Sequence, residues 1–400
     1  MRLLQDQHLG SRSLRFTVLA ALLACVVMLL SGASLQGFRW DLPSWVPPPA
    51  VPADNPMTRE KVDLGRHLFH DVRLSADESM ACATCHLQER AFTEPRAVST
   101  GVTGEAGLRN AMSLANVAYQ PTLTWANPLM ERLEIQALIP LFGEHPVEMG
   151  MAGKESLLFA RLQADTTYRR LFEAAFPDEA RSGAQTLFSV RTITQALASF
   201  QRTLVSFDSP YDRYKYGQQK QALSAAAQRG ESLFFGEKLE CYHCHGGLNF
   251  TDNQHHSRMP VAERGFHNTG LYNTNGRGAY PQGHHGVAEF TGQPTDMGRF
   301  RTPSLRNIAL TAPYMHDGSI PDLVSVIRLH YAIGGRAADL QGSAQPNPLR
   351  SPFIQGFEIS DTEVSDLVAF LESLTDRRFT QNPAFSNPWP QAHPKAKPSP

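Results

Sequence analysis

The sequence predicts a mostly α-helical protein with two similar domains and long irregular loops. Three observations support this fold class. The pentapeptide Cys-X-X-Cys-His occurs twice, at 82–86 and at 241–245. A related amphipathic segment precedes each copy, at 64–69 and at 229–234. Patterns that alternate apolar and polar residues, as half-buried strands do, are scarce.

Each pentapeptide carries the groups that attach a c-type haem covalently. Its two thiols form thioether bonds to the haem vinyl groups, and the adjacent histidine is the proximal iron ligand. A zinc site or a disulfide pair would not require the histidine at this fixed position. We therefore predict two cytochrome c-like domains, each with one covalent haem c, held by Cys82, Cys85 and His86 and by Cys241, Cys244 and His245.

The first 33 residues have the pattern of an export signal. Arg2, Arg12 and Arg15 precede an apolar run at 16–30, and small residues follow at 31–33. This run is shorter than the roughly 20 residues of a membrane-spanning helix. We expect a cleaved signal peptide at 1–33 and a periplasmic protein, because haem c is attached outside the bacterial cytoplasm. An uncleaved membrane anchor is the alternative.

The order of the remaining segments follows from composition and periodicity. A proline-rich stretch at 34–57 predicts an extended linker, and the proline- and alanine-rich end at 381–400 predicts a disordered tail. Between them we place an N-terminal domain at 58–217 and a C-terminal domain at 218–380. The first would carry a peroxide-binding haem and the second an electron-transfer haem, as the resemblance described below implies.

Two further helices and one loop are predicted inside these domains. Apolar residues recur at three- and four-residue steps from Leu187 to Leu204, which is typical of a helix with one buried face. The residues at 360–363 form a capping-box pattern that opens a helix. The stretch at 246–298 is rich in Gly, Asn and His and predicts an irregular loop around the second haem.

Whether either iron can bind a substrate distinguishes an enzyme from an electron carrier. A carrier fills both axial positions of each iron, whereas an enzyme leaves one free. After His86 the next histidine is His145, and no methionine falls between His86 and Met112. The first iron therefore has no obvious sixth ligand nearby. The formal net charge of -1 gives no indication of nucleic-acid or anionic-membrane binding.

Several segments resemble the bacterial dihaem cytochrome c peroxidase and MauG family. The segments at 266–271 and 296–300 are closer to the MauG-like branch, and in particular to MbnH-type enzymes, which modify a tryptophan on a partner protein. The other matching segments lie across the rest of the mature chain, at 109–110, 133–136, 146–149, 303–307 and 310–318.

The resemblance implies how the first haem works. Peroxidases place a histidine that blocks the resting haem at the position of Val102, so here this haem is expected to be open. Gln136 and Glu148 match the distal pair, and such a carboxylate can move the proton that promotes O–O cleavage of peroxide. Two extra residues before Glu148 leave Glu144 and His145 as alternatives. Solvated helix polar residues are the other interpretation of the distal pair.

The resemblance also implies a connection between the haems and a calcium site. Trp125 matches the tryptophan between the two haems, with an ordinary core residue as the alternative. Asn110, together with the carbonyl oxygens of Thr311 and Pro313, matches a calcium site between the domains. Hard oxygen ligands of this kind suit Ca²⁺.

The sixth ligand of the second haem is ambiguous. Counting forward from His316, the family's position falls on His330, and counting back from 334–335 it falls on Tyr331. One residue turns a side chain by about 100° around an α-helix, so only one of the two can face the iron. Imidazole is the better iron ligand, which favours His330, and Tyr331 stays the alternative.

These observations predict a periplasmic dihaem oxidoreductase. It would react with hydrogen peroxide to form high-valent haem iron and then oxidise a secreted protein partner, as MauG- and MbnH-like enzymes do, with tryptophan modification as the specific expectation. The first alternative is a cytochrome c peroxidase that detoxifies hydrogen peroxide with electrons from a small electron-donor protein. The second is a dihaem electron carrier without catalytic activity.

Overall fold

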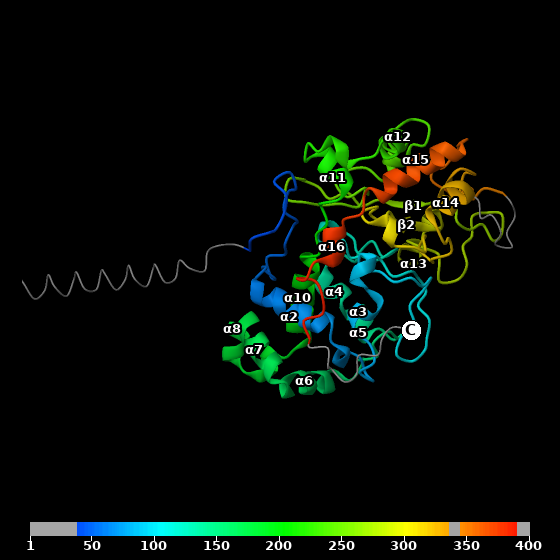
Figure 1. Cartoon of the computed structure of the whole chain (residues 1–400). Helices are drawn as coiled ribbons and strands as arrows, with labels where there is room; N and C mark the ends of the chain where they lie inside the picture. Colours follow the sequence, from blue (N-terminus) through cyan, green and yellow to red (C-terminus); the bar gives the residue numbers. More distant parts are fainter. Residues whose placement is uncertain (1–37, 336–344, 390–400) are drawn as a thin grey trace, which may run out of the picture. The chain divides into compact units, whose positions relative to one another are not determined.

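Helices supply most of the regular structure in the computed structural model, which describes residues 38–335 and 345–389 (Figure 1). Residues 42–389 belong to one compact unit. The predicted signal peptide at 1–33 lies outside the described residues. Within the described part, no helix is long and apolar enough to cross a membrane.

The first haem motif follows one member of a packed helix pair, α2 (Arg59–Phe69) and α10 (Val190–Arg202). The side chain of Thr58 caps α2, and that of Ser189 caps α10. At Gly65 the two backbones meet so closely that an added Cβ would lie 2.0 Å from the Ala196 carbonyl oxygen. The glycine in the predicted amphipathic segment is therefore required by the packing.

The second haem motif follows the equivalent pair, α12 (Ala225–Phe234) and α15 (Asp361–Glu372). Here an added Cβ at Gly230 would lie 2.0 Å from the Asp366 carbonyl oxygen. The Arg229 guanidinium also lies 2.6 Å from the Asp366 carboxylate. The predicted capping box at Ser360 is present, since its side chain accepts from the Glu363 amide. The internal repeat of the sequence is thus a repeat of structure.

The other elements are short and are joined by long loops. The strands β1 (Phe266–Asn268) and β2 (Arg299–Arg301) pair antiparallel and are the only sheet in the described residues, as the scarcity of strand patterns predicted. The remaining helices are α3 (Cys82–Cys85), α4 (Leu133–Gln136), α5 (Leu138–Phe142), α6 (Glu155–Ala164), α7 (Thr166–Ala175), α8 (Pro177–Ser182), α9 (Ala184–Leu187), α11 (Pro210–Lys215), α13 (Ala288–Thr291), α14 (Leu323–Ser325), a π-helix (Val326–Tyr331) and α16 (Arg377–Gln381), with several short 3-10 turns.

Two large hydrophobic clusters form the core. One contains buried residues between Leu64 and Leu204 together with Phe379 and Phe385, and the other contains buried residues between Tyr211 and Leu374. In Figure 1 the pair α2–α10 lies in the lower half of the molecule and the pair α12–α15 in the upper half. The division into domains at residues 217 and 218 stays a prediction.

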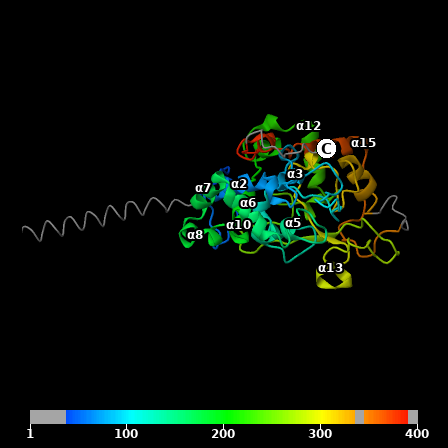
Figure 2. The ribbon, with the colours of Figure 1, turned by 90° about the horizontal axis from the view of Figure 1, so that it is seen from below.

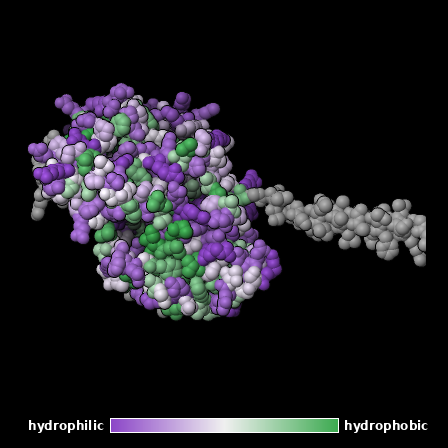
Figure 3. Space-filling view, turned by 180° about the vertical axis from the view of Figure 1, so that it is seen from behind, coloured by the Kyte–Doolittle hydropathy of each residue, from purple (hydrophilic) through white to green (hydrophobic). Residues whose placement is uncertain are grey.

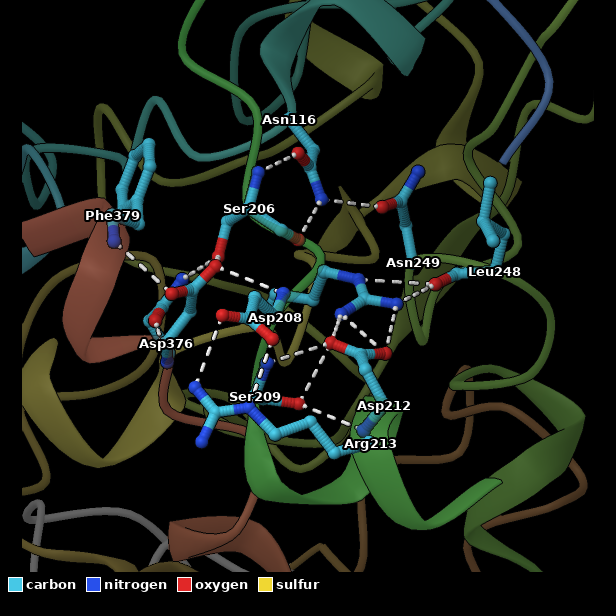
Figure 4. A network of polar contacts seen from close by, with 12 residues as sticks. Asn116, Ser206, Asp208, Ser209, Asp212, Arg213, Leu248, Asn249, Asp376 and Phe379 are labelled. Atoms are coloured by element: carbon cyan, nitrogen blue, oxygen red, sulfur yellow. Dashed lines mark hydrogen bonds and ion pairs between the residues drawn. The ribbon is translucent and has the colours of Figure 1, made fainter. Parts of the chain in front are cut away.

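A buried polar network joins the segments that lie between the two clusters (Figure 4). Arg306 pairs with Asp212 at 2.9 Å, and their side chains are only 1% and 2% exposed. Asn116 donates to Asn249 at 2.8 Å and to the Ser206 carbonyl at 3.0 Å. Removing one partner from a buried ion pair typically costs about 3–5 kcal/mol. This network therefore fixes how the second haem segment sits against the first.

Two segments pack against the first core, contrary to expectation. In the predicted linker, Asn55 is fully buried and donates to the Glu134 carboxylate at 2.7 Å. In the predicted disordered tail, Phe385 is buried, and its carbonyl oxygen lies 3.0 Å from the ring nitrogen of His70 on the C-terminal end of α2. The linker and tail predictions are therefore wrong for residues 42–57 and 381–389. Residues 390–400 lie outside the described part.

Candidate dihaem site

The two predicted proximal histidines are held in the same way. The Nδ1 atom of His86 lies 2.7 Å from the Phe92 carbonyl oxygen, and that of His245 lies 3.0 Å from the Phe250 carbonyl oxygen. Both phenylalanines have a left-handed backbone, with φ of 63° and 53°. A hydrogen bond from Nδ1 to a carbonyl leaves Nε2 as the free ligand atom and fixes the orientation of the ring. This is the geometry that a proximal iron ligand requires.

The second motif opens into a cavity of about 230 Å³. Cys241, Cys244 and His245 line it, and most of its other lining residues are apolar. An apolar cavity with a few polar groups at its edge suits a haem, whose ring is apolar and whose propionates are charged. The described cysteines form no disulfides. The residues present therefore fit a covalent haem c.

Arg301 adds a buried positive charge to this cavity. It is only 2% exposed, and its Nη1 atom has no partner among the described residues. Burial lowers the pKa of its guanidinium to about 9. An unpaired buried charge is unfavourable, so the arrangement fits a negatively charged haem propionate in the cavity. No sequence pattern predicts the burial of Arg301, because a three-residue strand carries too little periodicity to reveal which arginine is buried.

The two candidate ligands of the second iron stand differently toward this cavity. Tyr331 lines it together with Cys241 and Cys244. His330 is 1% exposed, is absent from the cavity lining and contacts the backbone of Thr269. Both residues lie on the π-helix, whose wider turn shifts the register of the side chains. Tyr331 is thus the candidate that lines the cavity, whereas the buried Nε2 atom of His330 has no hydrogen-bond partner among the described residues, and the choice between the two stays a prediction.

Glu94 and Glu148 are both near the first haem motif, and Glu94 accepts a hydrogen bond from Ser99. Burial raises the pKa of the Glu148 carboxyl. The alternatives, Glu144 and His145, are exposed. The assignment of the acid–base role to Glu148 stays a prediction.

Val102 packs against the segment that carries Glu148. Its amide donates to the Glu148 carbonyl at 2.8 Å, and its Cγ2 atom would lie 2.9 Å from a Cβ added at Gly150. The isopropyl group of valine has no atom that can coordinate iron. The position at which peroxidases carry a blocking histidine is thus filled by an apolar side chain.

Gln136 lies at the C-terminal end of α4 and is half-buried. The Met149 amide donates to the Pro140 carbonyl at 2.9 Å, so the segment of Glu148 runs beside α5, which follows α4. No hydrogen bond joins Gln136 to Glu148 in the described part of the chain. Ile135 and Ile139 are 48% and 41% exposed. Seen from behind, the molecule shows apolar side chains gathered in its lower half (Figure 3).

Trp125 connects residues around the two haem motifs. Its Nε1 atom donates to the Asn110 carbonyl at 2.8 Å, and its own carbonyl accepts from the Arg301 amide at 2.8 Å. Trp125 also lines the cavity at the second haem motif. The Arg301 guanidinium reaches the Met112 sulfur at 3.3 Å, and the Met112 backbone contacts His86. The position of Trp125 between the two haems stays a prediction.

The predicted calcium ligands offer oxygen atoms that have no other partner. The side-chain nitrogen of Asn110 donates to the carbonyl oxygens of Arg96 and Ala97, which leaves its Oδ1 atom free of hydrogen bonds within the described residues. The same holds for the carbonyl oxygens of Thr311 and Pro313. Amide and carbonyl oxygens suit Ca²⁺. The donor set therefore fits the ion.

Comparison with known proteins identifies the family. A family model described as di-haem cytochrome c peroxidase matches residues 59–220. The methylamine utilization protein MauG of Methylophilus methylotrophus is 37% identical over 82% of this chain and 86% of that protein. A cytochrome-c peroxidase of Denitromonas iodatirespirans is 34% identical over 82% of this chain and 85% of that protein. The chain belongs to the dihaem cytochrome c peroxidase and MauG family.

Solved structures agree with this family. A MauG-like protein associated with microbial copper homeostasis is 49% identical and has a TM-score of 0.83. The match covers 88% of this chain and all of that protein's chain. The dihaem peroxidase BthA from Burkholderia thailandensis has a TM-score of 0.60 at 23% identity, which shows the shared fold. The predicted family is confirmed. The protein is an oxidoreductase of the dihaem peroxidase type, a family that carries two haem groups.

Proposed function

We propose that this family member is an exported enzyme that uses hydrogen peroxide to oxidise a side chain of a protein partner, as MauG does. The observation that carries the proposal is the cavity at the second haem motif, which Tyr331 lines together with Cys241 and Cys244. The family resemblance places methionine at this position in peroxidases and tyrosine in MauG. A phenolate ligand stabilises high oxidation states of iron, so the second haem would store an oxidising equivalent instead of passing electrons rapidly.

The first haem would be the peroxide site. When bound, the haem pair supplies an open iron for peroxide and storage for two oxidising equivalents. Glu148 would take a proton from the incoming peroxide and return it to the departing oxygen. The Gln136 amide would orient the peroxide, and Val102 leaves its approach unblocked. His86, whose Nδ1 atom is held by the Phe92 carbonyl, would bind the iron.

The remaining residues would connect and stabilise the two sites. Trp125 would carry electrons between the haems, and Arg301 would neutralise a propionate of the second haem. Asn110, Thr311 and Pro313 would bind Ca²⁺, whose ligands come from both halves of the chain. The segment at 1–33 would direct export to the periplasm, and residues 58–217 and 218–380 would be the two haem domains.

The proposed partner is a secreted protein with a role in copper homeostasis. The support is the 49% identity to the MauG-like protein that is associated with this process. Tryptophan is the proposed target, because the segments at 266–271 and 296–300 resemble MbnH-type enzymes. Membership in a family of peroxidases and MauG enzymes favours these enzymatic interpretations over an electron carrier.

Mass spectrometry of a co-encoded secreted protein tests the proposal. The ferric enzyme is mixed with that protein and hydrogen peroxide, and a parallel sample receives no peroxide. We expect a permanent mass change at a tryptophan of the partner in the first sample only, and a smaller yield with Trp125→Phe. Rapid oxidation of reduced cytochrome c with an unchanged partner would replace this proposal with the detoxifying peroxidase.

A further inference from the structure

An aromatic cluster extends from Trp125 away from the second cavity. Tyr280 and Phe300 are buried in it, and Trp125 and Tyr272 pack against it. The ring centroids of Tyr272 and Tyr280 are 5.5 Å apart, and those of Tyr280 and Phe300 are 6.2 Å apart. Trp125 and Phe300 both line the cavity. A continuous set of aromatic contacts thus leads from the cavity to Tyr272.

Tyr272 lies at the outer end of this cluster. It is only half-buried, and its ring centroid lies 6.3 Å from that of His284. The adjacent Gly283 carbonyl accepts from Arg109, which also pairs with Glu289 on α13 at 2.6 Å. In Figure 2, α13 stands at the edge of the molecule. The cluster therefore ends at the surface beside α13.

The two tyrosines of the cluster have different hydrogen-bond partners. The Tyr272 hydroxyl donates to the Asp317 carboxylate, whose other oxygen accepts from the Ser319 amide at 3.0 Å. The Tyr280 hydroxyl donates to the Asn268 amide oxygen at 2.8 Å. A carboxylate can accept a proton from a phenol that loses an electron, whereas a side-chain amide is a very weak base. Tyr272 is thus equipped for oxidation to a neutral radical, and Tyr280 is not.

We infer that Tyr272 is the outer station of a radical relay that delivers oxidising equivalents from the haem pair to the docked partner. This inference rests on the proposed function. In each step, oxidised Trp125 gains one electron from Tyr272 across the cluster, and the hydroxyl proton of Tyr272 moves to Asp317. The partner side chain then returns one electron to the tyrosyl radical, which regains its proton from Asp317. Two such steps consume the two equivalents supplied by one hydrogen peroxide.

The relay explains how a buried haem pair oxidises a protein that cannot enter the cavity. The partner needs to reach only Tyr272 and the surface beside α13. The same contacts also predict which change separates the relay from the peroxide chemistry. Tyr272→Phe removes one hydroxyl and keeps the ring packed on Tyr280, so neither haem site is altered.

Freeze-quench electron paramagnetic resonance after peroxide addition tests this inference on the holoenzyme. In Tyr272→Phe we expect the optical change of the haems to form at the wild-type rate, the tyrosyl signal to be absent, and oxidation of the partner to be lost while partner binding is unchanged. Asp317→Asn should slow radical formation. In this variant the rate of radical formation should be the same in deuterated and ordinary solvent, whereas in the wild type it should be slower in deuterated solvent. The matched control is Tyr168→Phe, which removes another tyrosine–aspartate hydrogen bond, at 2.6 Å, in the first core.

The possible outcomes distinguish failure of the relay from failure of the proposed function. A wild-type tyrosyl signal and wild-type partner oxidation in Tyr272→Phe would overturn the relay and leave the proposed function intact. Haems that show no optical change with peroxide in the wild type would overturn the proposed function and, with it, the relay. A tyrosyl signal that disappears in Tyr168→Phe instead would assign the radical to the first core and refute the role of Tyr272.

Discussion

Replacing Glu148 by glutamine removes the proton acceptor at the first haem with almost no change in volume. The structure places this carboxyl beside Cys82 and Cys85, and its side chain has no hydrogen bond or ion pair within the described residues. General acid–base groups contribute about 10²–10⁴-fold in rate. We therefore expect the reaction with peroxide to slow by this factor, which corresponds to about 3–5 kcal/mol of activation free energy.

Stopped-flow spectra of ferric protein mixed with peroxide measure this rate, and the exposed Glu144→Gln is the control. Burial raises the pKa of Glu148 above 4.5, so the ionised base is lost as the pH falls through that raised value. The wild-type rate should drop across this pH range, and the rate of Glu148→Gln should stay flat. A normal rate in Glu148→Gln together with a slow Glu144→Gln would show that the insertion moved the role to Glu144.

Three further predictions concern the second haem, the helix packing and the metal site. Tyr331→Phe should convert the low-spin ferric signal of the second haem to high-spin while His330→Ala preserves it; the reverse result would make His330 the ligand. Gly230→Ala should lower the free energy of unfolding by about 1–3 kcal/mol or more, because its Cβ would lie 2.0 Å from a carbonyl of the facing helix. Gly107→Ala should not lower this free energy, because the nearest atom to its added Cβ would be 3.5 Å away. Equal denaturant midpoints for the two variants would refute the packing role of Gly230. Chelation of calcium should lower the thermal midpoint of the wild type and leave that of Asn110→Ala unchanged, whereas an equal response would remove Asn110 from the site.

Local patterns in the sequence predicted the haem segments well. The two pentapeptides, the helices before them and the capping box at Ser360 depend on neighbours within a few residues, and each has the predicted form. The glycines at 65 and 230 also belong to the repeated segments. Why these two positions require glycine becomes clear only when α2 packs against α10 and α12 packs against α15.

Features that depend on distant contacts could not be predicted. The choice between His330 and Tyr331 depended on a count of residues along the sequence. The π-helix changes the direction in which the side chain at each counted position points, because its turn is wider than that of an α-helix. Proline-rich composition indicates a backbone without helix or strand, but not whether it packs on a core, as the segments at 42–57 and 381–389 do. The burial of Arg301 likewise depends on segments that are far apart in the sequence.

A ferric protein with an open first haem and Tyr331 at the second haem should accept and store both oxidising equivalents of peroxide. The most direct measurement is to mix fully ferric protein with one equivalent of hydrogen peroxide, without reductant, and to count by reductive titration the equivalents that persist. We predict a long-lived species with both irons oxidised, which takes up two electrons on return to the ferric state. A spectrum that stays unchanged until one haem is first reduced would contradict the account and identify a peroxidase that requires reductive activation.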